Sequence, residues 1–257
     1  MATNPGDRDL PLVLLHGLLG DGRDWQPVID ALPGIDCHAL DLPGHGLNQP
    51  LRVSGFDEAN AWLCGELEAR GIHHYLLAGY SLGGRLALYH ASHSPAGLQA
   101  LLLENCHPGL PAAERPARIK HDEGWARRFE GEPLAKVLAD WYRQPVFADL
   151  DAAGRARQLA RRLGNQGRAV AAMLRATSLG KQPDLAPWLA STSLPVTWIS
   201  GTEDQKFHRL ACQLVKLGCN INHLTMNGGH NLHANQPETF ARLLREWVNQ
   251  PKEKLHD

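Results

Sequence analysis

The sequence predicts an α/β protein with a mostly parallel central sheet, and two observations support this fold class. Short apolar runs bounded by turn residues recur along the chain, and helical patterns lie between several of them. Such alternation is typical of a parallel sheet with helices on both faces. The predicted strands are Leu12–Leu15, Cys37–Leu40, Tyr75–Ala78, Leu98–Leu103, Val196–Ile199 and Ile221–Met226.

The predicted helices carry apolar residues at a spacing near that of one helical turn. One such pattern lies between the second and third strands, and another lies near the end of the chain. Their apolar positions are Phe56, Ala59, Trp62, Leu63 and Leu67 in the first pattern, and Phe240, Leu243, Leu244 and Trp247 in the second.

The alternation of strands and helices stops after Asn105. From there to about Ser193 the chain is rich in arginine and alanine, is divided by prolines such as Pro116, Pro133 and Pro145, and contains four helix-like stretches but no convincing strand. The sequence therefore predicts a helical lid over residues 106–193, inserted between the two parts of an α/β core, residues 1–105 and 194–257.

Composition limits the possible functions. The 257 residues carry a formal charge of −1, so the overall balance indicates neither a nucleic-acid partner nor an anionic membrane surface. The middle of the chain differs, because residues 114–175 contain 13 Lys/Arg against 8 Asp/Glu. A basic lid favours an acidic small molecule.

The five cysteines are scattered and lack the paired spacing of a zinc site or a redox motif, so they are expected to be reduced. The beginning of the chain, MATNPGDRDLPLVLLHG, has no basic start followed by a long apolar stretch. The run Leu12–Leu15 is too short for a signal peptide or a membrane span. We therefore expect a cytoplasmic protein.

The strongest motif is Gly79-Tyr80-Ser81-Leu82-Gly83, which directly follows a predicted strand and directly precedes an amphipathic stretch. A G-x-S-x-G turn in this context is typical of the nucleophile elbow of the α/β-hydrolase fold. The serine sits on a strained corner, and flanking glycines avoid collisions with neighbouring backbone. The backbone N–H of Leu82, at the start of the helix, would then face negative charge on a substrate.

A serine needs a histidine as base, and the histidine needs a carboxylate that orients it. In this fold the order along the chain is Ser, Asp/Glu, His, each after a strand. Asp204 in Gly201-Thr202-Glu203-Asp204 and His230 after Gly228-Gly229 fit that order. Glu203 competes with Asp204, and His208, His223 and His233 compete with His230 among 14 histidines.

A second N–H donor for an oxyanion is expected from the loop His16-Gly17-Leu18-Leu19-Gly20, with Leu18 as the candidate. His16 itself is interpreted as structural. Arg85 follows Ser81 by four residues and shares a helix face with it, although a cation is disfavoured in the first turn of a helix. A bound anion or a salt bridge would compensate, and the sequence leaves both open.

Together these strings resemble the 2-succinyl-6-hydroxy-2,4-cyclohexadiene-1-carboxylate synthases, the MenH enzymes of menaquinone biosynthesis. The resemblance covers nearly the whole chain and includes parts of the lid, where generic hydrolases diverge. It rests on HGLLGDGRDWQ, DLPGHG, GYSLGGR, HPGL, ADWYRQPVF, MLRATSL, QPDL and GGHNLH.

The resemblance implies a lyase without cofactor or metal, in which Ser81, Asp204 and His230 remove a ring proton before pyruvate leaves. It assigns the substrate's carboxylates to Arg85, Arg118 and Arg162, and lines the pocket with Tyr80 and Trp141, to which we add Leu18, Leu82 and Phe147. A small polycarboxylate is the expected partner of a monomer or weak homo-oligomer.

Two other functions fit the same motifs. A serine esterase or a carbon–carbon bond hydrolase would use Ser81 to form an acyl-enzyme, and the triad residues do not exclude it. A ligand receptor could retain the fold and triad for binding alone. An ester-hydrolysis burst would favour the hydrolase, and an unaltered biological output of Ser81→Ala would favour the receptor.

Overall fold

The structure is a computed structural model that describes residues 10–249, so the expectation for the beginning of the chain lies largely outside the described residues. Within them, six strands form one parallel sheet in the order β2-β1-β3-β4-β5-β6. The strands are β1 (Leu12–Leu15), β2 (Cys37–Leu40), β3 (Tyr75–Tyr80), β4 (Leu98–Glu104), β5 (Val196–Gly201) and β6 (Asn222–Met226). The predicted fold class is confirmed.

Alternate residues of each strand supply two apolar layers, one on each face of the sheet. In β1, Val13 and Leu15 join one buried cluster, whereas Leu12 and Leu14 join the other. Side chains of successive strand residues point to opposite faces, so continuous apolar runs mark a sheet covered on both sides. Because both faces of the sheet are covered, all four residues of a strand such as β1 are apolar, and the sequence shows the strand as an unbroken apolar run.

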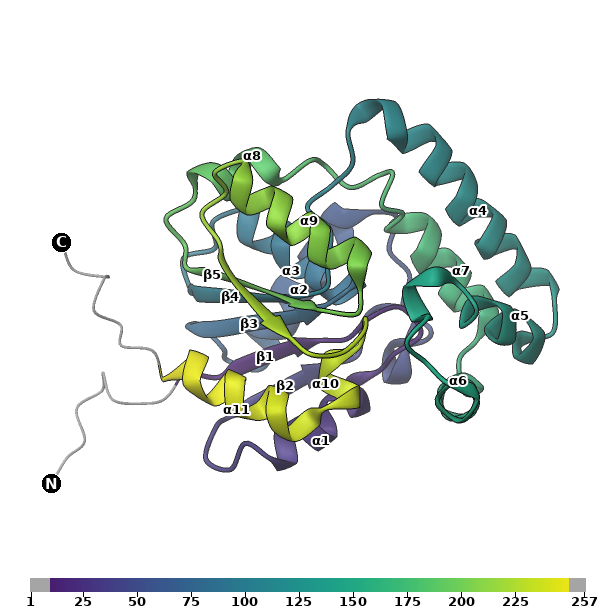
Figure 1. The fold of residues 1–257 in the computed structure, drawn as a ribbon, viewed down its shortest axis with the longest axis horizontal. Coiled ribbons are helices and arrows are strands. Elements are labelled where there is room, and N and C mark those ends of the chain that lie inside the picture. The colour runs from purple at the N-terminus through teal and green to yellow at the C-terminus, as the bar shows by residue number, and fades with distance from the viewer. Residues whose placement is uncertain (1–9, 250–257) are drawn as a thin grey trace, which may run out of the picture.

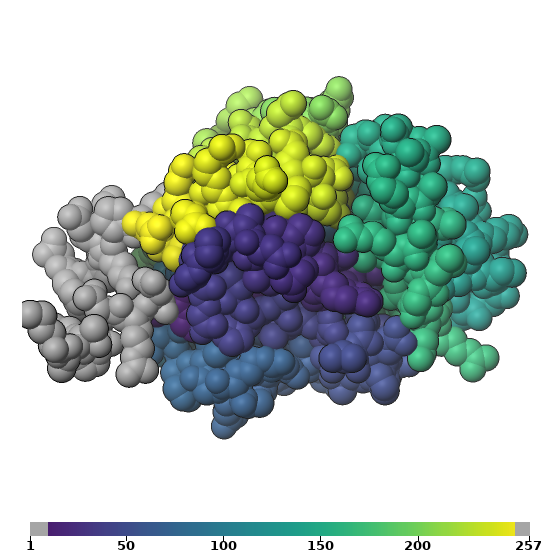
Figure 2. All heavy atoms as spheres, turned by 90° about the horizontal axis from the view of Figure 1, so that it is seen from below, coloured from purple at the N-terminus to yellow at the C-terminus, as the bar shows by residue number. Residues whose placement is uncertain are grey.

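Helices cover both faces (Figure 1). The first layer is closed by α2 (Phe56–Ala69), α3 (Leu82–Ser92) and α9 (Gln205–Lys216). The second is closed by α1 (Gln26–Asp30) and α11 (Pro237–Val248), with the short α10 (Leu232–Asn235) beside them. Seen from below, the N-terminal and C-terminal parts of the core lie side by side, and the green helical segment lies at one end of them (Figure 2).

The segment between β4 and β5 contains helices and no strand, and it has five α-helices where the sequence suggested four. They are α4 (Arg115–Gly131), α5 (Leu134–Trp141), α6 (Ala152–Arg162), α7 (Gly167–Ala176) and α8 (Ala186–Ser191). The fifth, α8, spans only six residues, too few to show a helical period.

The lid, defined as residues 106–193, has an apolar cluster of its own. Its members come from α4, α5 and α7, and include Phe129, Val137 and Leu174. Leu19, from the loop after β1, is inserted into this cluster. The lid is therefore packed onto the carboxyl end of the sheet. No helix within residues 10–249 is both long and apolar enough to cross a membrane.

Candidate active site

Ser81 lies between β3 and α3 with φ of 51° and ψ of −109°. A positive φ is costly for a residue with a side chain, and it persists only where the surroundings enforce it. Here the surroundings are backbone. A Cβ on Gly79 would lie 2.6 Å from the carbonyl carbon of Gly83, and a Cβ on Gly83 would lie 2.4 Å from the carbonyl oxygen of Leu15. Both glycines are therefore required for the corner that presents the serine.

The structure brings Ser81, His230 and Asp204 together. His230 Nδ1 lies 2.6 Å from Asp204 Oδ2, and His230 Nε2 lies 3.3 Å from Ser81 Oγ. The imidazole and the carboxylate are both buried. The longer serine contact does not exclude a role for His230 as base, because such hydrogen bonds often shorten only when a substrate binds.

Asp204 has a second contact that fixes its position. Its other oxygen, Oδ1, accepts a hydrogen bond from the N–H of Phe207 at 3.2 Å and so caps α9. The competing Glu203 is exposed. The shorter side chain thus holds the helix and the imidazole at the same time.

The competing histidines have other partners. Nδ1 of His233 lies 2.7 Å from Glu104 Oε2, deep beside the site. His208 and His223 both lie within hydrogen-bonding distance of Ser200 Oγ, at 3.0 and 2.8 Å. None of these contacts involves Ser81, so the geometry does not support His233, His208 or His223 as the base for the Ser81 hydroxyl.

The loop after β1 is held by two buried histidines. His16 Nε2 accepts a hydrogen bond from the N–H of Leu42 at 3.0 Å, and His45 Nε2 accepts one from the N–H of Leu19 at 3.1 Å. Burial lowers the pKa of His16 and lowers the pKa of His45 to about 3, so both rings are neutral acceptors. Among the described residues, His16 thus holds the backbone of Leu42, as expected for a structural histidine.

Two backbone N–H groups remain available for an oxyanion. Within residues 10–249, no protein acceptor is bonded to the N–H of Leu18 or of Leu82. Leu82 opens α3, and the first N–H groups of a helix have no partner inside it. Leu18 lines a cavity beneath the lid together with Gly17, Tyr80 and Phe147. These are the donors that the sequence suggested.

Arg85 is partly buried and has no carboxylate partner among the described residues. Its Nη1 donates to the backbone oxygen of Thr177 at 2.8 Å and to Gln182 Oε1 at 3.3 Å. Desolvation, with repulsion from Arg118, lowers its pKa to about 10. None of the ion pairs formed within residues 10–249 includes Arg85. Of the two compensations left open by the sequence, the salt bridge is therefore absent from the described structure.

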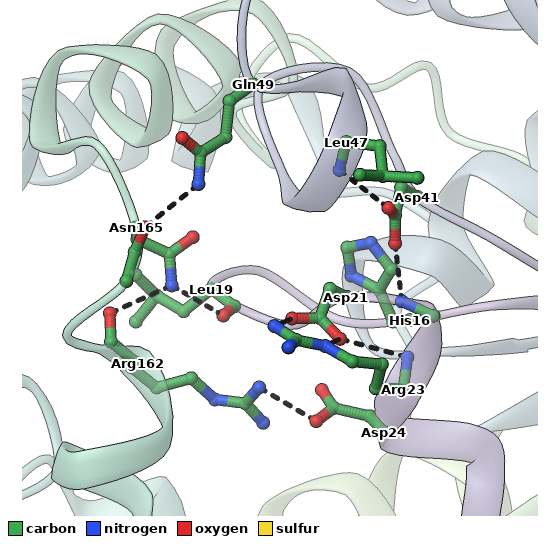
Figure 3. A network of polar contacts seen from close by, with 12 residues as sticks. His16, Leu19, Asp21, Arg23, Asp24, Asp41, Leu47, Gln49, Arg162 and Asn165 are labelled. Carbon is green, nitrogen blue, oxygen red and sulfur yellow. Dashed lines mark hydrogen bonds and ion pairs between the residues drawn. The ribbon is translucent and has the colours of Figure 1, made fainter.

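The other two predicted arginines are already paired. Arg118 Nε lies 2.8 Å from Asp122 Oδ1, and the same aspartate accepts a hydrogen bond from Ser178 Oγ at 2.7 Å. Arg162 Nη1 lies 2.8 Å from Asp24 Oδ1, and both side chains are buried (Figure 3). Arg118 keeps 31% of its side chain exposed, whereas Arg162 keeps 6%. A ligand could therefore reach the guanidinium of Arg118 from solvent, whereas the guanidinium of Arg162 is buried in its ion pair.

Arg85, Arg118 and Lys206 form a cationic region, and the sequence did not single out Lys206. Desolvation, with repulsion from Arg118, lowers the pKa of Lys206, although its side chain still reaches solvent. Desolvation, together with repulsion from all three cations, lowers the pKa of the neighbouring His107 to about 3. Arg118 therefore lies near both Arg85 and Lys206, and all three cations lie near His107. Only the position of Lys206, two residues after Asp204, could have indicated it.

The predicted aromatic residues separate into two groups. Tyr80 and Phe147 both face His230, with ring centroids 5.3 and 6.0 Å from its ring. Trp141 instead packs edge-on against Trp125, with centroids 5.0 Å apart, in the lid. Tyr80 and Phe147 therefore flank the imidazole of His230, while the contact of Trp141 lies within the lid and its place in the pocket stays a prediction.

The cavity beneath the lid is also lined by groups outside the predicted set of site residues. Gln158 and Tyr142 line it beside Arg162, and Gln158 Oε1 is buried without a hydrogen-bond partner among the described residues. In the described part of the chain, no group of three or more His, Cys, Asp or Glu side chains is arranged to hold a metal ion.

Comparisons with known proteins agree with this architecture. Residues 12–243 match the model of the alpha/beta hydrolase family. A structure of MenH from S. aureus superposes with a TM-score of 0.85 at 26% identity, covering 94% of each chain. An esterase from Thermogutta terrifontis superposes with a TM-score of 0.74 at 20% identity, covering 93% of this chain and 89% of the esterase. The second similarity concerns the fold alone.

Curated relatives are more similar in sequence. A 2-succinyl-6-hydroxy-2,4-cyclohexadiene-1-carboxylate synthase from Serratia proteamaculans is 45% identical over 249 residues, which is 96% of either chain. One from Yersinia enterocolitica is 47% identical over 241 residues, covering 93% of this chain and 86% of the relative.

Proposed function

The chain belongs to the family of 2-succinyl-6-hydroxy-2,4-cyclohexadiene-1-carboxylate synthases, and we propose that it catalyses the elimination that yields the compound in that name. The substrate would be 2-succinyl-5-enolpyruvyl-6-hydroxy-3-cyclohexene-1-carboxylate, a small polycarboxylate of menaquinone biosynthesis. The observation that carries the proposal is the contact chain from Ser81 Oγ through His230 to Asp204 beside the cationic region.

The reaction needs a base for a ring proton. Ser81 Oγ takes that proton while its own proton passes to His230 Nε2, which lies 3.3 Å away. The electron pair of the broken C–H bond at ring carbon 2 forms a double bond between carbons 2 and 3, the existing double bond shifts from carbons 3 and 4 to carbons 4 and 5, and the C–O bond from carbon 5 to the enolpyruvyl group breaks. The leaving enolate regains a proton and becomes pyruvate, so no water and no oxidant is consumed.

Negative charge develops during this step, and the site has donors for it. The N–H groups of Leu18 and Leu82 would stabilise the delocalised anion because they are fixed before the reaction begins. Asp204 stabilises the imidazolium of His230, with which it shares a 2.6 Å contact.

The substrate's carboxylates would be bound by the arginines. Arg85 has only neutral acceptors in the described structure, so an anion supplies the charge partner that it lacks. Arg118 is partly exposed and can receive a carboxylate beside Asp122. Arg162 lines the cavity but is paired with Asp24, so of the three arginines it is the least available to bind a carboxylate.

We also infer that the enzyme works in the cytoplasm. All five cysteines are free in the structure, which suits a reducing compartment. Cell fractionation provides the test, and we expect the pyruvate-releasing activity in the lysate of washed spheroplasts. Recovery of that activity with periplasmic or secreted proteins would contradict the inference.

The function is tested by measuring pyruvate release from the proposed substrate. We expect turnover by the wild-type protein and a loss of about 10³-fold or more in Ser81→Ala, by analogy with other triads. Ser92→Ala, on the same helix, removes only a hydroxyl bonded to the backbone of Tyr89 and should retain activity. A pre-steady-state burst on p-nitrophenyl acetate without pyruvate release would favour an esterase.

A further inference from the structure

The last residue of β4 and the residue after it contact all three loops of the triad. The carbonyl oxygen of Glu104 accepts a hydrogen bond from the N–H of Ser81 at 3.0 Å. Asn105 and the side chain of Glu104 contact the two other loops. Neither residue touches the serine oxygen, so any role in the reaction must act through the geometry of the site.

The amide of Asn105 joins the acid loop to the histidine loop. Its Oδ1 accepts a hydrogen bond from the N–H of Gly201 at 3.2 Å, three residues before Asp204. Its Nδ2 donates to the carbonyl oxygens of Gly229 and His230 at 3.2 and 2.8 Å. This orientation of the amide is the one that satisfies all three contacts, since reversing it would oppose donors to a donor and acceptors to acceptors.

The backbone of Asn105 is held in an unusual conformation. Its φ is 42°, its side chain is fully buried, and its N–H donates to the carbonyl oxygen of Ile199 at 3.0 Å. Asparagine adopts the left-handed region more readily than most residues, because its short polar side chain can bond locally. The amide is therefore rigidly placed.

Glu104 fixes the other side of the same loop. Its Oε1 accepts hydrogen bonds from the N–H groups of Leu232 and His233 at 2.7 and 3.2 Å, and its Oε2 lies 2.7 Å from His233 Nδ1. The Asn105 amide thus binds the backbone at Gly229 and His230, and the Glu104 carboxylate binds the backbone just after it, at Leu232 and His233. Because the contact of His230 with Ser81 is already 3.3 Å, a small shift would break it.

We propose that Asn105 is a positioning residue of the triad, which keeps His230 within reach of Ser81 by tying its loop to the loop of Asp204. This inference rests on the catalytic role proposed for the triad but not on the identity of the substrate. A displacement of about 1 Å in an active site can lower the rate on the order of 100-fold.

The test replaces Asn105 by glycine, which removes the amide and tolerates the positive φ. Ser94→Gly is the matched control, because Ser94 also has a positive φ, of 52°, and lies after α3 away from the triad. We expect kcat for pyruvate release to fall by about 10- to 100-fold in Asn105→Gly, with KM changed less than about twofold. Ser94→Gly should match the wild type.

A second measurement separates this inference from the proposed function. Phenylmethylsulfonyl fluoride reports on the activated serine without any natural substrate, and we expect it to label Ser81 more slowly in Asn105→Gly than in the wild type. Slower labelling of Asn105→Gly, together with a wild type that is labelled but releases no pyruvate, would refute the proposed function and leave the positioning role standing. Labelling and kcat at wild-type values, per folded protein, would overturn the positioning role.

A second variant, Asn105→Asp, has a side chain of almost the same size as asparagine, so it tests the proposal even if Asn105→Gly fails to fold. Asn105→Asp retains an acceptor for Gly201 but opposes a carboxylate to two carbonyl oxygens, so the histidine loop should be displaced. We expect the low-field proton resonance of the His230–Asp204 hydrogen bond to broaden or shift in this variant. An unchanged resonance with unchanged labelling would count against the proposal.

Discussion

Arg162 Nη1 and Asp24 Oδ1 lie 2.8 Å apart, in an ion pair whose side chains are 6% and 8% exposed. The pair joins the end of α6 to the loop after β1, and beside it Asn165 Nδ2 donates to the carbonyl oxygen of Leu19 at 3.0 Å (Figure 3). A buried charge that loses its partner is costly, which makes this pair a test of how the lid is attached.

Asp24→Asn should lower the free energy of unfolding by about 3 kcal/mol, because it leaves Arg162 buried without a counter-charge. Chemical denaturation measures the change. Asp21→Asn removes the exposed pair with Arg23 and should cost less than about 1 kcal/mol. If succinate raised the melting temperature no more in Asp24→Asn than in the wild type, Arg162 would not be a carboxylate site.

Resemblance alone predicts that Arg162→Ala weakens turnover far more than folding, and the ion pair changes that expectation. Removing Arg162 would leave Asp24 buried and unpaired, so stability should fall together with activity. Arg118→Ala should affect turnover more than folding, because Arg118 is partly exposed. Paired melting and pyruvate-release measurements on both variants distinguish the two cases.

Arg85→Met should lower kcat/KM by about 10- to 100-fold, the loss expected for a charged hydrogen bond of roughly 1.5–3 kcal/mol. Stability should change little, because the guanidinium bonds only neutral acceptors and methionine fills a similar volume. Turnover and thermal unfolding of the purified variant provide the check. A large loss of stability with normal kcat/KM would assign Arg85 to the fold instead of the ligand.

Gly83→Ala should destabilise the elbow by about 1–3 kcal/mol and abolish most activity, because the new methyl group would meet the carbonyl oxygens of Leu15 and His16, each at 2.4 Å. Gly65→Ala is the matched control on α2, where an added Cβ meets nothing within 4 Å. Alanine there should stabilise by about 0.5–1 kcal/mol. Equal unfolding midpoints of the two variants would contradict the packing argument.

The buried histidines predict loss of stability in mild acid. Burial lowers the pKa of His45 to about 3, so the unfolded chain binds a proton near pH 6.5 that the folded chain refuses. Stability should therefore fall as the pH drops below about 6.5, by about 1.4 kcal/mol per pH unit for such a group. His45→Asn should flatten the slope between about pH 6.5 and 5 in denaturation experiments, and an unchanged slope would exclude His45 as its source.

Much of the fold could be predicted because its signals are local. The apolar run of β1 marks a buried strand, and the motif around Ser81 marks the corner after β3. The order of Asp204 and His230 along the chain then followed from the fold class.

The remaining features depend on contacts between distant segments. Nothing near Arg162 in the chain indicates that Asp24, 138 residues away, would be its partner. Asn105 was visible only as the point where strand and helix stop alternating, since its role arises from the meeting of three strand ends. That Trp141 lines the pocket stays a prediction, because its neighbours depend on how α4 and α5 pack in the lid.

The insertion of Leu19 into the apolar cluster of the lid makes the lid and the loop after β1 a single packing unit. Leu18, whose N–H we propose as an oxyanion donor, directly precedes Leu19, so a substitution inside the lid cluster should alter the rate of the reaction without touching the substrate.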